Sequence, residues 1–145
     1  MAKLMRKINV ISRCASMYRA QNSGDNLPGI YHSYIFVIYN NPGLSQDKLA
    51  KRLCINKSNV TRHMSFLESN GYITRCTSDK DKRELLVYPT EKLNNVYPEI
   101  KKISREWNEL VSCDISEEEL LMFESILDKL SARAMELVYP AEDEQ

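Results

Sequence analysis

A chain of 145 residues is long enough to bury a hydrophobic core without metals or disulfides. Its composition, 43% hydrophobic and 28% charged, excludes an intrinsically disordered chain, and its apolar runs are too short to cross a membrane. The four cysteines lack the spacing of a zinc site or a disulfide framework, and no signal peptide is recognisable. We therefore expect a cytoplasmic protein that binds no membrane, no metal and no cofactor.

The net charge is zero, but the charges are segregated along the chain. Residues 1–22 carry five basic side chains and no acidic one, and residues 45–83 carry nine basic and four acidic ones, a net charge of +5. Residues 114–145 carry ten acidic and two basic side chains, a net charge of −8. The cationic middle suits a contact with phosphate, although the solvated faces of an ordinary protein give the same pattern.

Two helices are predicted at the N-terminal end of the chain. Apolar residues at steps of three and four predict a helix from about Lys3 to Gln21. The following segment, 22–29, is dense in turn-forming residues. We expect the chain to break there and to resume as a second helix from about Tyr31 to Tyr39.

A helix-turn-helix is predicted next. Ser45 is a suitable N-cap for a short helix over 46–53, and Asn56 is a suitable N-cap for a fourth helix with apolar side chains again three and four residues apart. Gly71 suits the left-handed position that ends this helix. Two helices joined by so short a turn are typical of a helix-turn-helix, with the second one as the candidate recognition helix.

The outer face of the candidate recognition helix carries short polar and cationic side chains. Such groups can hydrogen-bond to base edges and phosphates in a major groove. A helical hairpin alone is a weak signal, because many helical bundles contain one. The DNA contacts that we expect from this region are Ser45, Lys57, Ser58, Asn59, Thr61, Arg62 and Ser65.

A β-hairpin with a charged tip is predicted directly after this helix. Segments 72–76 and 84–88 are rich in β-forming residues, and Pro89 is expected to end the second strand at about Tyr88. A hairpin in this position is the wing of a winged helix, whose basic tip can follow the DNA backbone or enter a minor groove. Its candidate DNA contacts are Arg75, Lys80, Lys82 and Arg83.

The helical period returns after the hairpin. It predicts a long helix from about Thr90 to Ser112, and the capping box at Ser116 and Glu119 opens a last helix that turns apolar residues such as Phe123 inward. The predicted fold is mainly α with a small β-hairpin, a winged helix-turn-helix with terminal helices. We expect a single domain over 1–145, with the winged helix-turn-helix lobe over 31–89.

The chain resembles the MarR family of bacterial regulators over nearly its whole length. The resemblance is strongest over Asn41–Leu53, Asn59–Arg62, Leu67–Gly71 and, in the hairpin, Asp81–Arg83. It implies a homodimer in which helices over 1–22 and 90–140 of two copies interleave, which leaves two winged lobes to bind a pseudo-palindromic operator in double-stranded DNA.

The resemblance also implies roles for single residues. Ser58, Asn59, Thr61 and Arg62 would contact the major groove, and Arg83 would enter the minor groove with Asp81 as its support. The chain departs from the family pattern at positions that usually carry an aliphatic residue, a polar residue and a glycine, and these departures leave local packing and sequence preference open. The departing residues are His63, Phe66 and Leu93, and we interpret His63 as a histidine at the edge of the core rather than a pH switch.

Two kinds of signal could act on such a regulator. The family often binds aromatic or phenolic acids, and the residues that could line an effector pocket here are Arg13, Tyr18, Tyr31, His32 and Tyr34, although the tyrosines could equally pack where the first two helices meet. Some relatives sense hydroperoxides through a cysteine of the first helix. Cys14 is the candidate here, with a small buried hydrophobic side chain as the simpler interpretation.

The sequence therefore predicts a sequence-specific DNA-binding transcriptional regulator, a homodimeric repressor that a small-molecule effector releases from its operator. One alternative is a winged-helix module that binds protein and no DNA, and another is a regulator that senses oxidants through cysteine. An enzyme is not expected, because the sequence contains no nucleophile elbow, P-loop, HExxH or GxGxxG motif.

Overall fold

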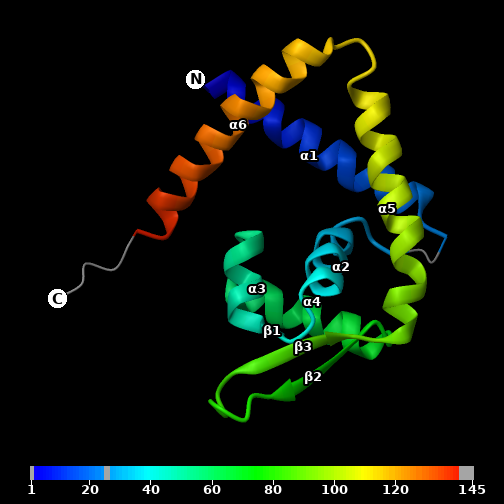
Figure 1. Cartoon of the computed structure of the whole chain (residues 1–145), viewed down its shortest axis with the longest axis vertical. Coiled ribbons are helices and arrows are strands. Elements are labelled where there is room, and N and C mark those ends of the chain that lie inside the picture. The colour runs from blue at the N-terminus through cyan, green and yellow to red at the C-terminus, as the bar shows by residue number, and fades with distance from the viewer. Residues whose placement is uncertain (1, 25–26, 141–145) are drawn as a thin grey trace. The chain divides into compact units, whose positions relative to one another are not determined.

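The computed structural model describes residues 2–24 and 27–140, and it is mainly α-helical with a small antiparallel sheet, as predicted (Figure 1). Within these ranges no helix is both long and apolar enough to span a membrane. The chain divides into two compact units, 1–107 and 108–145, each described by itself. The elements in chain order are α1 (Ala2–Asn22), α2 (Tyr31–Asn40), β1 (Leu44–Ser45), α3 (Gln46–Leu53), α4 (Lys57–Ser69), β2 (Ile73–Thr77), β3 (Leu85–Pro89), α5 (Glu91–Val111) and α6 (Glu117–Val138).

The ends of the helices follow from local side-chain chemistry. Ser45 Oγ accepts a hydrogen bond from the Lys48 amide at 3.2 Å and so begins α3, and Asn56 Oδ1 accepts from the Asn59 amide at 2.8 Å and so begins α4. Gly71 has a φ of +78°, the left-handed conformation predicted for it after α4. The predicted caps are therefore confirmed at both helices of the helix-turn-helix.

A short strand that the sequence did not predict completes the sheet. β1 pairs antiparallel with β3, and β3 pairs antiparallel with β2, so that the order is β1-β3-β2. The Gly43 amide donates to the Val87 carbonyl at 2.8 Å beside this pairing. Because β1 has only two residues, it produces no alternation of polar and apolar residues that a sequence could reveal.

The second strand of the hairpin, predicted to end at about Tyr88, extends one residue further, because Pro89 still pairs with Ile73. The neighbouring hydrogen bond runs from the Thr90 amide to the Tyr72 carbonyl at 3.0 Å. Since hydrogen-bonded and non-hydrogen-bonded pairs alternate along an antiparallel ladder, Pro89 occupies a position where no amide hydrogen is needed.

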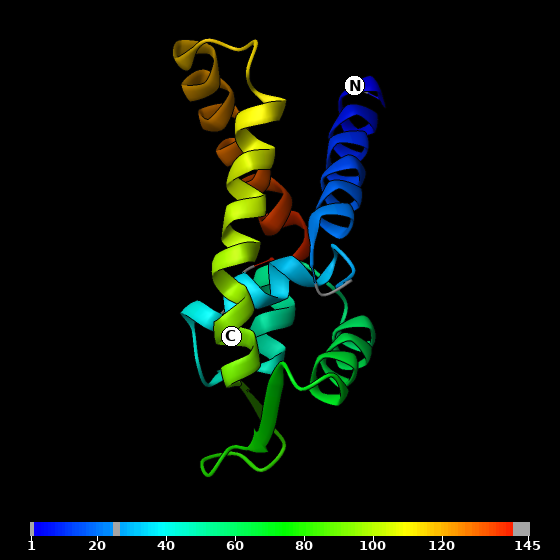
Figure 2. The same ribbon diagram turned by 90° about the vertical axis from the view of Figure 1, so that its right-hand side faces the viewer.

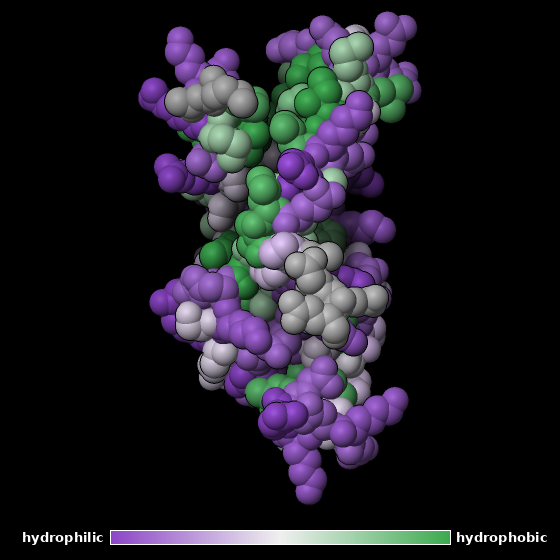
Figure 3. Space-filling model, turned by 90° about the vertical axis from the view of Figure 1, so that its left-hand side faces the viewer, coloured by the Kyte–Doolittle hydropathy of each residue, from purple (hydrophilic) through white to green (hydrophobic). Residues whose placement is uncertain are grey.

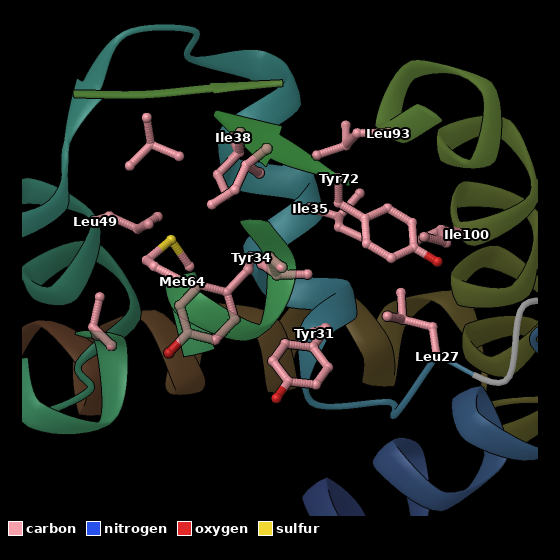
Figure 4. Packing of buried hydrophobic residues seen from close by; sticks show 14 of the residues in the cluster. Leu27, Tyr31, Tyr34, Ile35, Ile38, Leu49, Met64, Tyr72, Leu93 and Ile100 are labelled. Atoms are coloured by element: carbon pink, nitrogen blue, oxygen red, sulfur yellow. The ribbon is translucent and has the colours of Figure 1, made fainter. Parts of the chain in front are cut away.

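The core of the winged lobe (residues 31–89) is built around α2. Figure 4 shows Tyr34 and Ile35 of α2 with Leu49 on one side and Leu93 of α5 on the other, and all four are fully buried. Burying a side chain of this size contributes about 1.5–3 kcal/mol relative to leaving it exposed. Leu93 replaces the glycine that the family pattern usually has here, so this departure adds to the core.

The terminal helices leave apolar side chains exposed. No residue of α6 is buried within the chain, so the expected inward packing of Phe123 is not achieved by one chain alone. Figure 3 shows apolar side chains at the surface, in green, between hydrophilic ones in purple. The exposed apolar residues of these helices are Leu4, Met5, Val10, Ile11 and Met17 in α1 and Leu121, Met122, Phe123, Ile126, Leu130, Leu137 and Val138 in α6.

Candidate nucleic-acid interface

The polar face of α4 lies on the surface of the winged lobe. Val60, Met64 and Leu67 are fully buried and fix one side of the helix against the core. The opposite side therefore points to solvent, as expected from a helical repeat of three to four residues. The exposed residues on it are Lys57, Ser58, Thr61, Arg62 and Ser65, and Asn59 is half-buried beside them.

Most side chains on this face are already oriented by hydrogen bonds inside the lobe. Thr61 Oγ1 donates to the Lys57 carbonyl at 2.9 Å, and Ser65 Oγ donates to the Thr61 carbonyl at 3.0 Å. Arg62 Nη2 donates to Asn59 Oδ1 at 3.0 Å. The two hydroxyl protons are used within the helix, which leaves oxygen lone pairs that can accept hydrogen bonds from base amino groups.

Ser45 differs from the other residues that the sequence assigned to this interface. Ser45 is only 2% exposed, and its hydroxyl caps α3 through the Lys48 amide. In this arrangement Ser45 cannot contact DNA through its side chain, and its role is to begin the helix. Lys57 remains available, since its pair with Asp47 at 3.4 Å joins two well-exposed side chains.

The tip of the β2–β3 hairpin extends beyond the helices of the lobe (Figures 1 and 2). Asp81 Oδ1 accepts hydrogen bonds from the Arg83 amide at 3.0 Å and from Arg83 Nε at 3.3 Å. The Arg83 side chain is 92% exposed, so the bond to Asp81 orients its guanidinium without covering it. Lys80 and Lys82 are exposed in the same loop.

Ser78 is a residue of this tip that sequence reasoning missed. It is buried, and its hydroxyl accepts from the Lys80 amide at 3.2 Å and from the Asp81 amide at 3.5 Å. Its own amide donates to the Glu84 carbonyl at 2.9 Å. A serine ahead of a charged loop was the available signal, because serine hydroxyls often bond to backbone amides two or three residues further on.

Arg75 lies at the base of the hairpin rather than at its tip. It is ion-paired with Glu68 of α4 at 2.7 Å and hydrogen-bonded to Gln46 of α3 at 3.3 Å. The hydrogen bond from Arg75, with the opposite charge of the guanidinium, lowers the pKa of Glu68. Sequence reasoning missed Glu68 and Gln46 as partners of Arg75, because both contacts depend on the tertiary fold.

The residues predicted to line an effector pocket lie in three different environments. Arg13 is exposed, and Tyr18 packs against Trp107 with ring centroids 5.3 Å apart. Tyr31 stacks on Phe66 at 4.4 Å, and Tyr34 OH is 2.8 Å from His63 Nδ1. This contact and the burial of His63 confirm it as a histidine at the edge of the core.

His32 is fully buried, and neither of its ring nitrogens has a hydrogen-bond partner within the described residues. Arg19 Nε on α1 is equally without a partner there. Burial, together with the positive charge of Arg19, lowers the pKa of His32 to about 4. Sequence reasoning chose Arg13 as the cation for a carboxylate, whereas Arg19 is the arginine whose charge acts on His32.

The cysteines do not form a recognisable reactive site. Cys14, Cys54, Cys76 and Cys113 are all exposed, so the interpretation of Cys14 as a small buried hydrophobic side chain is wrong. The side chains of Tyr31 and Tyr34 on α2, the helix that follows, contact Phe66 and His63 of the lobe. In the described part of the chain no three potential ligand side chains are grouped as a metal site would require.

A recognition helix with a polar outer face, followed by a hairpin that presents a braced arginine, defines a winged helix-turn-helix protein. Residues 32–85 match the model of the MarR family. The HTH-type transcriptional regulator BilQ of Clostridium symbiosum is 30% identical over 112 residues, which cover 76% of this chain and 75% of that protein. The uncharacterized HTH-type transcriptional regulator YybA of Bacillus subtilis is 26% identical over 131 residues, 90% of this chain and 87% of that protein.

A solved structure extends the similarity to nearly the whole fold. A putative MarR family transcriptional regulator from Listeria monocytogenes, complexed with a 26mer DNA, is 26% identical and covers 97% of both chains with a TM-score of 0.80. The chain belongs to the MarR family of DNA-binding transcriptional regulators, which are not enzymes. The predicted fold class and family are confirmed.

Proposed function

We propose that this protein is a sequence-specific repressor that binds a pseudo-palindromic operator as a homodimer. The observation that carries the proposal is the pairing of two DNA-directed features in one lobe: the polar outer face of α4 and the exposed Arg83 held by Asp81. The α4 face suits base edges in the major groove, and a basic hairpin tip suits the minor groove. Lys80 and Lys82 would add contacts to phosphate.

The exposed apolar faces of α1 and α6 support the homodimer. Apolar side chains such as Ile11 on α1 and Ile126 on α6 are about half exposed in the single chain, which is costly in water. A second copy would cover these faces if the helices over 1–22 and 90–140 form the dimer interface. The two recognition helices would then need to lie about 34 Å apart to enter successive major grooves. Such a regulator would act in the cytoplasm, where the operator is.

The test of this function is selection of binding sites from a random duplex pool, with the mass of the protein in solution measured in parallel. We expect an enriched inverted repeat with half-sites about one helical turn apart, bound by a dimer. A folded protein that enriches no sequence at low salt would contradict the proposal and would favour a winged-helix module that binds another protein.

The effector that we propose is a small aromatic or phenolic acid. Support comes from His32 and Arg19, whose buried nitrogens lack partners within the described residues and could bind a carboxylate. Tyr18, the neighbour of Arg19 in the chain, packs against Trp107 and would offer an aromatic wall. A ligand that binds better to a dimer whose lobes are wrongly spaced for DNA would release the operator.

Trp107 is the only tryptophan of the chain, so its fluorescence can report binding near Tyr18. We expect benzoate, used as the probe, to change the Trp107 emission and to weaken operator binding. Arg19→Gln should abolish both effects, and Arg13→Gln, a matched change on the exposed arginine of the same helix, should not. Loss of the response in the Arg13 variant alone would contradict the choice of Arg19.

A further inference from the structure

Side chains of the helix-turn-helix surround the guanidinium of Arg75. Its Nη2 and Nε donate to Glu68 Oε2 at 2.7 and 3.1 Å. Its Nη1 donates to Gln46 Oε1 at 3.3 Å, and its Nη2 also lies 3.4 Å from Ser65 Oγ. The Arg75 side chain is 16% exposed, so most of its hydrogen-bonding capacity is used inside the protein.

The backbone of Arg75 is bound by the same carboxylate. β2 is an edge strand, because the sheet order is β1-β3-β2, and an edge strand has amide groups without a partner in the sheet. The Arg75 amide donates to Glu68 Oε1 at 3.2 Å. One glutamate near the end of α4 therefore binds both the main chain and the side chain at the base of the hairpin.

This cluster continues to the reading face of α4. Gln46 Nε2 donates to Thr61 Oγ1 at 3.1 Å, while Gln46 Oε1 accepts from Arg75. A chain of hydrogen bonds thus runs from Thr61 on α4 through Gln46 at the start of α3 to Arg75 on β2 and back to α4 at Glu68. Connected polar groups of this kind restrain each other's orientation when all are satisfied.

We propose that Arg75 and Glu68 are positioning residues, which fix the hairpin relative to the reading face of α4 and so determine sequence preference, and that Arg75 is not a phosphate contact. This inference rests on the proposed DNA-binding function. The two arginines of the hairpin differ in exposure: Arg83 is 92% exposed and is oriented towards solvent, whereas Arg75 is enclosed. Moving Arg75 to a phosphate would leave the Glu68 carboxylate without its cation.

Because Glu68 is negatively charged, the direction in which Glu68→Gln changes operator affinity is decisive. If only long-range electrostatics mattered, Glu68→Gln would remove a negative charge near DNA and tighten binding. If Glu68 positions the hairpin, the same variant weakens binding to the selected operator by about tenfold and leaves binding to random duplex almost unchanged. The ratio of the two affinities, measured by fluorescence anisotropy, is therefore the main readout.

Two further variants separate positioning from phosphate binding. Arg75→Gln should reduce the same affinity ratio, with the slope of affinity against salt concentration unchanged, while the control Arg83→Gln should lower that slope by about one. Arg75→Lys keeps the charge but loses the planar fork, so it should behave like Arg75→Gln. Full operator affinity in Arg75→Lys, or a slope lowered by about one in Arg75→Gln, would overturn the proposal.

A measurement on the free protein tests the contact without DNA. Glu68→Gln should accelerate hydrogen exchange of the Arg75 amide by about tenfold or more, because that amide loses its carboxylate partner. The Thr74 amide, in the residue pair with Tyr88 of β3, serves as the internal control. Unchanged exchange of the Arg75 amide in Glu68→Gln would overturn the positioning contact. A wild-type protein that selects no DNA sequence would instead overturn the proposed function, so the two failures are distinguishable.

Discussion

The winged lobe and the terminal helices use apolar residues in opposite ways. In the lobe, Tyr34, Ile35 and Leu49 are fully buried by neighbours from the same chain. In α6, Phe123 and Ile126 repeat with helical spacing but remain about half exposed. The core of the lobe is therefore closed by residues of one chain, whereas we propose that the apolar face of α6 is covered by a second copy.

A charge placed on the apolar face of α6 should have the largest effect, because this face is proposed to lie in the dimer interface. Ile126 is 47% exposed in the single chain, so Ile126→Glu should cost the isolated fold little but should disrupt a dimer by burying a carboxylate. Loss of two-site binding should weaken operator affinity by about a hundredfold or more. Sedimentation should show a folded monomer.

Lys129→Glu introduces the same side chain at a position of α6 that is already charged and exposed. This control should remain dimeric at the protein concentrations where Ile126→Glu is monomeric. A dimeric Ile126→Glu variant would show that α6 does not use this face for association.

Two leucine truncations should distinguish stability within one chain from stability that depends on association. Leu49→Ala removes a fully buried side chain, and we expect the free energy of unfolding to fall by about 2–5 kcal/mol, independently of protein concentration. Leu121 is 61% exposed, so Leu121→Ala should reduce stability only where the protein associates, with a loss that depends on concentration. Urea unfolding at two protein concentrations measures both, and equal losses in the two variants would contradict the distinction.

The features that the sequence predicted well depend on neighbours within a few residues. Ser45, Asn56 and Ser116 cap helices because each side chain reaches an amide three residues ahead, which a sequence displays directly. The brace between Asp81 and Arg83, two residues apart, was implied by the family resemblance, and the structure contains it. Local chemistry of this kind was sufficient to locate the helix-turn-helix and the tip of the wing.

The features that the sequence missed depend on partners far along the chain. Arg75 was predicted to contact DNA, and its hydrogen bond to Gln46, 29 residues away on another element, was not visible in the sequence. β1 is visible only through its pairing with β3. Arg19 and Arg13 are equivalent in a helical sequence pattern, and only burial of Arg19 beside the core distinguishes them. The fold was therefore more predictable than the roles of individual cations.

The smallest expected effect concerns the pH dependence of the stability of the lobe. Burial, aided by the charge of Arg19, gives His32 a folded-state pKa of about 4, below the value near 6.5 for an unfolded chain. Between these values the unfolded chain binds a proton that the folded chain does not. The free energy of unfolding should therefore fall as the pH drops through this window and should be fully retained above it.

His32→Leu should flatten this decline, because it removes the group that protonates only on unfolding. Burial and the charge of Arg62 also lower the pKa of His63, so His63→Gln should flatten the curve in the same direction, and the two variants together should do so further. Urea unfolding between pH 7 and 4 gives the comparison. If His32→Leu showed the same dependence of stability on pH as the wild type, the buried neutral histidine would not be a source of the acid sensitivity. The next group to test would then be the carboxylate of Glu68, whose pKa is lowered by Arg75.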